Sequence, residues 1–395
     1  MLQKIEFAGG NATSFEHAAE TLKQLAEFDI SGKHVQRLTE RLGAERQRER
    51  DREVEAFRRL ELRPAHAQPP RVVAIHVDAG KAQMRKDDGA PGVREPHWGD
   101  TKVACLNSYT APVPQDRDPA PEPPAAFLDP PHVARLVAEV NRVRSHPTPP
   151  APEPLGPPAE PPEEKASPDR PRVLVRTAVA TTRDSEYFGY LVAAEACRRG
   201  FYEAAVKAVL GDGGNWIGPL GDTHFPGWLQ VLDFVHLLGH LYAAALAAFT
   251  GSRSRAWALY EKLLRAAWAG KVGEVLATLE RHQQRLGPPP EGASDDDPRR
   301  ILARVLTYVR GNAGRMDYPQ YRRLGLPVSS AAVESLIKQF NQRVKGTEKF
   351  WVKDRLEELL QVRAAYLSQD DRARDFFARR PPGRAARSSP LRSAA

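Results

Sequence analysis

Three acidic residues stand where a metal-dependent nuclease would need them. Asp78 ends the apolar run RVVAIHVD, and Asp212 follows a second apolar run, with glycines on both sides. Glu334 lies near the start of a late amphipathic stretch. Cleavage of a phosphodiester requires an activated water and a stabilised leaving oxygen, and two divalent ions held by carboxylates supply both. We therefore expect Asp78, Asp212 and Glu334 to hold two Mg²⁺ or Mn²⁺ ions per active site.

Each of the three acids also has an ordinary structural interpretation. Gly-Asp-Gly-Gly around Asp212 is typical of a tight turn, and an acid at the end of a strand, such as Asp78, is common. Glu334 and Lys338 can form an exposed i,i+4 ion pair worth about 0.3–0.5 kcal/mol. The order of the three acids along the chain, across a core with a helical insertion, is what favours the catalytic interpretation.

An α/β core must position these acids. Short β-branched runs predict strands, and apolar residues at 3.6-residue spacing predict helices. Strands are expected at 71–78, 81–85, 102–109, 172–180, 204–210 and 228–234. Helices are expected at 185–199, 237–249, 255–268, 272–286, 299–309, from Ser329 or Ser330 to 344, and at 353–367.

The segments outside this core differ in composition. Residues 14–43 predict two short helices, with Ser31 as an N-cap and Gly43 as a stop, arranged either as a helix-turn-helix or as a plain helical hairpin. Charged residues 45–58 predict a solvated connector. Residues 112–171 hold roughly half of the 35 prolines and predict an extended linker, interrupted by a helix-like stretch at 132–143. The Arg-, Pro- and Ser-rich tail from Arg379 predicts disorder.

The predicted division of the chain follows from these changes in composition. It comprises a helical DNA-binding region (1–58), a core (70–111 and 172–250), a proline-rich linker insertion (112–171), a helical insertion (251–328), the C-terminal part of the core (329–370) and a basic disordered tail (371–395).

Composition narrows the class of protein. Lys and Arg exceed Asp and Glu by 58 to 50, giving +8 and a pI near 9.5, which favours a polyanionic partner. Cys105 and Cys197 lack the spacing of a zinc ribbon or a disulfide scaffold. Neither a leader pattern nor an apolar run long enough for a membrane is present, so we expect a cytoplasmic, nucleoid-associated protein.

Five stretches carry a resemblance to a known family. They are VVAIHVDAGKAQMR, HWGDTKVACLNSY, FYEAAVKAVLGDGGNWI, FPGWLQVLDFVHLLGHLY and RGNAGRMDYPQYRRLGLPVSSAAVESLIKQFNQRVKGTEKFW. Together they cover most of residues 72–367 apart from the proline-rich insertion. The chain resembles the bacterial ISKra-type insertion-sequence transposases, in the Mutator-like group of DDE enzymes.

The resemblance implies a fold, an activity and roles for five residues. It implies an RNase H-like mixed-sheet core that cleaves and joins DNA strands, with Asp78, Asp212 and Glu334 as metal ligands. Asp233 and His236 match an Asp-x-x-His motif of the group, as catalytic residues that position a phosphate or a carboxylate; a plain strand-to-helix hydrogen bond is the alternative. The chain departs from the family at Ala79, where Gly is commoner, and in having no cysteine before Cys105.

Basic and aromatic residues outside the acids are candidates for DNA contacts. A recognition helix would use basic residues of the second helix, and residues on and after the helix of Glu334 would grip the DNA backbone or stack on a base. The candidates are Lys33, Arg37, Lys338, Arg343, Lys345 and Trp351. A solvated face with one core tryptophan is the alternative for the last group.

Three functions fit these observations. The first is a transposase that acts on transposon ends and target DNA as a homodimer or a higher oligomer. The second is a catalytically decayed or domesticated copy that only binds DNA, against which the complete set of acids argues. The third is another RNase H-like nuclease such as a junction resolvase, against which the long helical insertion argues.

Overall fold

A mixed five-stranded sheet forms the centre of the protein. The computed structural model describes residues 1–65, 68–85, 97–110, 116–143, 171–346 and 349–380. The strands lie in the order β3-β2-β1-β4-β5. They are β1 (Val72–Met84), β2 (His97–Tyr109), β3 (Val173–Thr181), β4 (Val206–Gly211) and β5 (Leu229–Leu232). β1 to β3 are antiparallel neighbours, whereas β1, β4 and β5 run parallel. The expected α/β class is confirmed.

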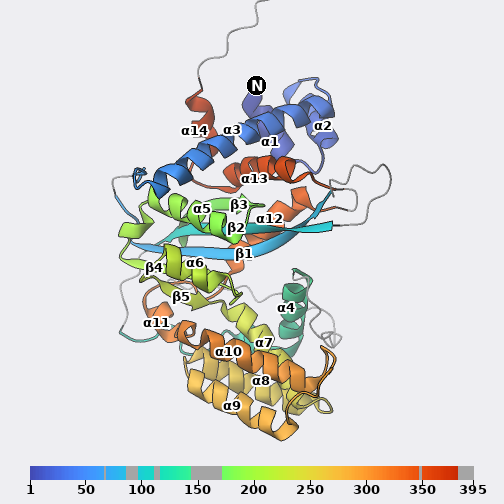
Figure 1. The fold of residues 1–395 in the computed structure, drawn as a ribbon, viewed down its shortest axis with the longest axis vertical. Helices are drawn as coiled ribbons and strands as arrows, with labels where there is room; N and C mark the ends of the chain where they lie inside the picture. The colour runs from blue at the N-terminus through green and yellow to red at the C-terminus, as the bar shows by residue number, and fades with distance from the viewer. Residues whose placement is uncertain (66–67, 86–96, 111–115, 144–170, 347–348, 381–395) are drawn as a thin grey trace, which may run out of the picture.

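Helices cover both faces of the sheet and form a separate block below it (Figure 1). Helices α5 and α6 pack on one face, and α12 and α13 pack on the other. The helices are α1 (Leu2–Asn11), α2 (Phe15–Ala26), α3 (Gly32–Arg58), α4 (Pro130–Val143), α5 (Ser185–Arg198), α6 (Ile217–His224), α7 (Phe234–Ala248), α8 (Arg253–Trp268), α9 (Val272–Leu286), α10 (Pro298–Asn312), α11 (Tyr318–Arg323), α12 (Ala331–Val344), α13 (Lys353–Leu367) and α14 (Arg372–Ala378).

The first strand is longer than expected. The sequence predicts separate strands at 71–78 and 81–85, but β1 is continuous from Val72 to Met84 and pairs with β2 along its whole length. Gly80 stays in the extended chain and does not end the strand. A Cβ at this position would lie 2.8 Å from Oγ1 of Thr101 on β2, so the close cross-strand approach explains the glycine.

The N-terminal helices are docked on the core. No separate helix is predicted at the position of α1. Gly43 does not end a helix as predicted, because it lies inside α3, which is 27 residues long. A Cβ at Gly43 would lie 2.3 Å from the backbone oxygen of Glu358, so this glycine lets α3 approach α13 closely. The solvated helical connector predicted at 45–58 is helical, as the C-terminal half of α3, but it is not solvated throughout, since Arg46 and Arg50 are both 8 % exposed.

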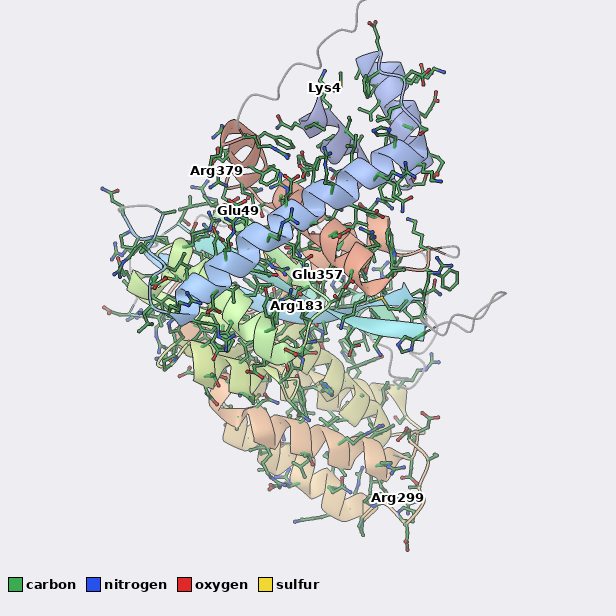
Figure 2. The ribbon with its side chains drawn as sticks, turned by 45° about the horizontal axis from the view of Figure 1, so that its top comes forward. Lys4, Glu49, Arg183, Arg299, Glu357 and Arg379 are labelled. Carbon is green, nitrogen blue, oxygen red and sulfur yellow. The ribbon has the colours of Figure 1, made fainter. Side chains whose placement is uncertain are left out.

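One buried carboxylate joins three of these elements. Glu357 of α13 accepts hydrogen bonds from Nη1 of Arg50 on α3 (2.6 Å), Oγ1 of Thr181 at the end of β3 (2.8 Å) and the backbone N–H of Thr182 (2.6 Å). A second buried pair, Arg46 with Glu6, ties α3 to α1. Figure 2 shows Glu357 beneath the long α3. Two of the charged residues that predict a solvated segment, Arg46 and Arg50, are therefore paired inside the protein with carboxylates of α1 and α13.

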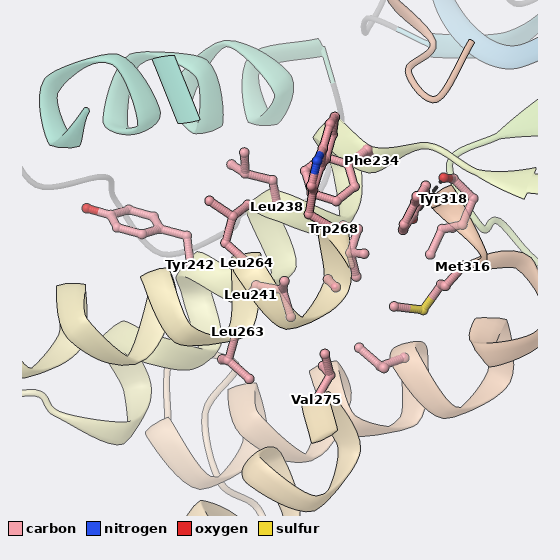
Figure 3. Packing of buried hydrophobic residues seen from close by; sticks show 14 of the residues in the cluster. Phe234, Leu238, Leu241, Tyr242, Leu263, Leu264, Trp268, Val275, Met316 and Tyr318 are labelled. Carbon is pink, nitrogen blue, oxygen red and sulfur yellow. Dashed lines mark hydrogen bonds between the residues drawn. The ribbon is translucent and has the colours of Figure 1, made fainter. Parts of the chain in front are cut away.

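Helices α7 to α11 form a helical block, which includes the predicted insertion and shares one apolar core with β1, β4 and β5. Phe234, Leu238 and Trp268 meet there with Met316 and Tyr318, as Figure 3 shows. The predicted helices in this block are confirmed within a few residues at each end. Because β4 and β5 belong to the same apolar cluster, the block is continuous with the sheet.

Part of the proline-rich segment is packed, contrary to the prediction of an extended linker. The helix expected at 132–143 is confirmed as α4, and Val133 and Val137 are buried in the core of the helical block. Nε1 of Trp268 donates to the carbonyl oxygen of Ala120 (2.8 Å). The described part of this proline-rich segment therefore contains a regular helix and makes apolar and hydrogen-bonding contacts with the helical block. Residues 111–115 and 144–170 lie outside the described residues.

The described part of the predicted disordered tail, residues 371–380, is folded onto the protein. α14 occupies part of it, and Arg372 at its start pairs with Glu195 of α5 at 2.7 Å. Residues 381–395 lie outside the described residues. Within the described part of the chain, every helix is too short or too polar to cross a membrane.

Alanine substitution should have opposite effects on stability at a crowded glycine and at an uncrowded one. Gly43→Ala should lower the free energy of unfolding by about 1–3 kcal/mol, because its methyl group would overlap the backbone of α13. Gly239→Ala, within α7, should raise it by about 0.5–1 kcal/mol, since no described heavy atom lies within 4 Å of a Cβ there. Urea unfolding of both variants measures the two effects, and stabilisation by Gly43→Ala would contradict the close approach.

Candidate functional site

Strand register places Asp78 and Asp212 at the same level of the sheet. The parallel pairing of β1 with β4 ends at His76 and Leu210, and Asp78 and Asp212 each follow two residues later. In-register residues of parallel neighbours point to the same face of a sheet. The two predicted metal ligands are thus carried by adjacent strands at the same height.

Asp233 continues this row onto the next strand. The last pair of β4 and β5 ends immediately before Asp212 and Asp233. The backbone N–H of Asp233 donates to the carbonyl oxygen of Gly211 at 2.9 Å, which fixes the level of Asp233. Three acids therefore succeed one another across β1, β4 and β5.

Helix α12 brings Glu334 to the same face. Residues of β1 that alternate with the buried Ile75 and Val77 turn toward α12. A Cβ at Gly80 would lie 3.9 Å from Cγ2 of Ile337, which follows Glu334 by one helical turn. Asp78, two residues before Gly80, lies on this same side of β1.

Among the described residues, Asp233, His236 and Glu334 form a close group of potential metal ligands. One ligand atom from each lies within 4.8 Å of the others. Asp233 caps α7 through a bond from the backbone N–H of Val235 to Oδ1 (2.9 Å), and its Oδ2 contacts Nδ1 of His236. The Asp-x-x-His spacing achieves this because residues i and i+3 lie on one side of a helix.

Ser330 links the two carboxylates of this group. Its Oγ donates to Oδ2 of Asp233 and lies 3.0 Å from Oε1 of Glu334. The sequence predicts a helix start near Ser329 or Ser330. Ser330 occupies the N-cap position of α12, but its hydroxyl makes no capping bond and contacts the two carboxylates instead. One hydroxyl proton can satisfy only one carboxylate at a time, so Glu334 is the less well stabilised partner.

The pKa values of the two carboxylates move in opposite directions. Burial alone would raise the pKa of Asp233, but the charge and hydrogen bond of His236, with Ser330 and the N–H of Val235, outweigh it and lower the pKa. Burial raises the pKa of Glu334, and the negative charge of Asp233 adds to the effect. Glu334 is therefore the member of the group that a cation would relieve most.

The structure brings together the predicted site residues only in part. Of the three predicted metal ligands, Glu334 alone belongs to the group described above; Asp78 and Asp212 lie outside it. Oδ1 of Asp78 accepts from the N–H of Ala79 (2.7 Å), and Oδ1 of Asp212 accepts from that of Gly214 (2.8 Å). The bond of Asp212 is the turn contact that the Gly-Asp-Gly-Gly run suggests, whereas Asp78 makes its bond within the extended chain of β1.

A buried histidine next to the row of acids was missed by the sequence analysis. His76 precedes Asp78 by two residues on β1 and is completely buried. Its Nε2 lies 2.8 Å from Oη of Tyr109. Burial lowers the pKa of His76 to about 4, against the opposing charge of Asp233. The sequence around His76 is an apolar strand and does not indicate that Asp233, more than 150 residues later, lies near it.

Two predicted DNA contacts after Glu334 are structural. Arg343 is 2 % exposed, and its Nε donates to the carbonyl oxygen of Gly9 in α1 (3.1 Å). Burial, with the nearby charge of Arg363, lowers the pKa of Arg343 to about 10. Trp351 packs partly buried against the core, and its Nε1 donates to the carbonyl oxygen of Val344 (2.9 Å). The alternative of a core tryptophan describes it better.

The other candidates for DNA contacts lie at the surface. Lys33 and Arg37 are exposed on α3, and Lys345 is partly exposed after α12. Lys338 is about half exposed and pairs with Glu139 of α4. An exposed pair of this kind is weak and leaves the lysine available to a stronger anion.

The opposite pKa shifts predict a gain in stability from removing Glu334. Its folded pKa lies above the ordinary 4.5, so ionisation costs stability, and this cost grows as the pH rises through the folded value. In EDTA at pH 7, Glu334→Gln should therefore melt at a higher temperature than the wild type. The difference should shrink as the pH falls toward 4.5, and a lower melting temperature at pH 7 would contradict the assignment.

Asp233→Asn should have the reverse effect. The folded pKa of Asp233 lies below its ordinary 3.8, so its charge stabilises the protein above that pH and the contribution is lost as the pH falls through the folded value. We expect a loss of about 2 kcal/mol at pH 7, since hydrogen bonds to a buried charge are broken. The melting temperatures of both variants and of the wild type, measured in EDTA between pH 4.5 and 7, test the two predictions.

Burial separates the roles of two neighbouring basic residues. Arg343→Ala should lower the free energy of unfolding by about 2–3 kcal/mol, because the carbonyl oxygens near the end of α1 lose a charged donor. Lys345→Ala should leave stability nearly unchanged, weaken binding to duplex DNA and reduce the salt dependence of binding by about one ion. Unfolding curves and salt titrations test both, and a large loss of stability in Lys345→Ala would oppose the surface role.

The site stands without support from related proteins. No family model matches the chain, and no curated protein matches it. The site combines a row of acids at the ends of parallel strands with a carboxylate–imidazole group whose ligand atoms lie within 4.8 Å of one another.

Proposed function

We propose that this protein is a DDE-type DNA transposase of the Mutator-like group, with an RNase H-like core. One observation carries the proposal: Asp78, Asp212 and Asp233 lie level on three adjacent parallel strands, and α12 presents Glu334 to the same face. A β-meander followed by two parallel strands, with a helical block before the last acid, supports the RNase H-like assignment.

The donor set fits hard divalent cations. Carboxylate oxygens prefer Mg²⁺ and Mn²⁺, and a single imidazole is compatible with Mn²⁺. We propose that Asp78, Asp212 and Glu334 hold two such ions, with the Asp233–His236 pair at their edge. When bound, the ions would activate a water for strand cleavage and neutralise the charge on the leaving oxygen.

The remaining residues of the site have positioning roles in this proposal. Asp233 fixes the ring of His236, and Ser330 holds Asp233 against Glu334. The raised pKa of Glu334 keeps its proton affinity high until a cation or a phosphate-bound ion arrives. Asp233, whose pKa is lowered, keeps its charge and balances His236.

Charge on the surrounding surface supports a nucleic-acid partner. The net charge is +8, and Lys338 lies one helical turn beyond Glu334. A phosphate approaching Glu334 would compete with Glu139 for this lysine. Transposon ends and target DNA are the proposed partners, bound by a homodimer or a higher oligomer.

Neutral substitutions of the three acids test the catalytic proposal. Asp78→Asn, Asp212→Asn and Glu334→Gln should each reduce strand cleavage more than about a hundredfold, because even residues that only support metal ligands are worth 10–100-fold. Binding to DNA and folding should remain. The assay incubates protein with a duplex carrying the end of its own element, in Mg²⁺ or Mn²⁺, and measures 3′-end nicking.

The matched control for these variants is Asp222→Asn, an exposed acid on the neighbouring α6. It should cleave like the wild type. A variant of one of the three acids that cleaves normally removes that residue from the site. A wild type that binds the end but never nicks it favours the decayed, DNA-binding alternative.

A further inference from the structure

Tyrosines of the helical block reach back to the strand ends that carry the acids. Oη of Tyr308 on α10 donates to the backbone carbonyl oxygen of Asp212 at 2.8 Å, across 96 residues of chain. Oη of Tyr318 on α11 donates in the same way to Leu232, the residue before Asp233, at 3.0 Å. The helical block thus contacts the backbone of both loops at the level of the acids.

The loop after Asp212 is packed against the ring of Tyr308. Gly213 has φ +79°, a conformation that glycine adopts without strain. A Cβ at Gly213 would lie 2.9 Å from Cε2 of Tyr308 and 2.9 Å from Cδ1 of Leu232. The loop is therefore confined between β5 and α10, and the close approach of Tyr308 requires a residue without a side chain.

Tyr308 is itself held in place. Its ring stacks on that of His240, one turn beyond His236 on α7, with centroids 3.8 Å apart. Asn312, one turn further along α10, donates from Nδ2 to the carbonyl oxygen of Tyr308 at 2.9 Å. Arg315 then donates to Oδ1 of Asn312 at 3.2 Å. The hydroxyl that supports Asp212 is thus mounted on a rigid part of the helical block.

We infer that Tyr308 is a positioning residue for the metal-binding carboxylate of Asp212. The inference rests on the proposed function, since it takes Asp212 as a metal ligand. Binding by an acid on a glycine-rich loop depends on holding that loop within a fraction of an ångström. Tyr308 supplies the restraint from outside the sheet, which makes the helical block part of the metal site.

Tyr308→Phe tests this role with little change in packing, because the ring remains and only the hydroxyl is lost. Tyr260→Phe is the matched control: Oη of Tyr260, on α8 of the helical block, donates to the carbonyl oxygen of Phe127 in the segment before α4 at 3.0 Å. Both variants should lose similar stability, about 1 kcal/mol. Mn²⁺ affinity, measured from the electron paramagnetic resonance of free Mn²⁺, should fall roughly tenfold in Tyr308→Phe alone.

Asp212→Asn, titrated in parallel, separates failure of this inference from failure of the proposed function. If Mn²⁺ binding is weakened in Asp212→Asn and in Tyr308→Phe but not in Tyr260→Phe, the positioning role stands. If it is weakened in Asp212→Asn but normal in Tyr308→Phe, or equally weakened in both tyrosine variants, the positioning role is wrong. If Asp212→Asn binds Mn²⁺ like the wild type, Asp212 is no ligand and both proposals fall.

Discussion

The register between the three parallel strands is the constraint on which the site depends. Side chains alternate between the two faces of a strand, so a slip of one residue between β1 and β4 would turn Asp78 and Asp212 to opposite faces. The apolar core prevents such a slip, because Ala74 and Ala208 are buried toward one face and Ile75 and Val209 toward the other. Chemistry at the surface is therefore set by hydrophobic packing beneath it.

The two carboxylates Asp233 and Glu334 differ in how well the protein stabilises their charge. Asp233 is surrounded by donors and stays charged, whereas Glu334 shares Ser330 with it and is repelled by it. Because the charge of Asp233 is stabilised and that of Glu334 is not, a cation bound beside Glu334 would stabilise the site. The folded protein bears that cost because the sheet and α12 hold the two carboxylates close together, with Ser330 between them.

Periodic elements could be predicted from the sequence, whereas elements set by distant contacts could not. The strands around Asp78 and Asp212 and the helices of the insertion follow from local apolar patterns. The local preference of Gly43 predicts a helix stop, but packing against α13 overrides it. The type and position of Arg343 predict a DNA contact for the same reason, because its partner α1 lies more than three hundred residues away in the sequence.

In the candidate site, too, contacts between residues close in sequence could be predicted, whereas contacts between distant residues could not. Asp233 and His236 could be paired from their spacing, since both lie in the first turn of one helix. The attachment of Ser330 to Asp233, 97 residues apart, and of Tyr308 to the Asp212 loop required the three-dimensional structure. Only the acids themselves, and not the groups that hold them, had residue types that suggested chemistry.

The bond between Arg50 and Glu357 has a consequence for the order in which the protein is made. Its partners are 307 residues apart, so during translation the N-terminal helices are complete long before their anchor on α13 exists. Domains generally form as their sequence emerges, but long-range contacts must wait for the last segment. Glu334 precedes Glu357 by 23 residues, so the group of Asp233, His236 and Glu334 also waits for this late part of the described chain. Final assembly of the core and completion of the site thus occur in the same short interval of synthesis.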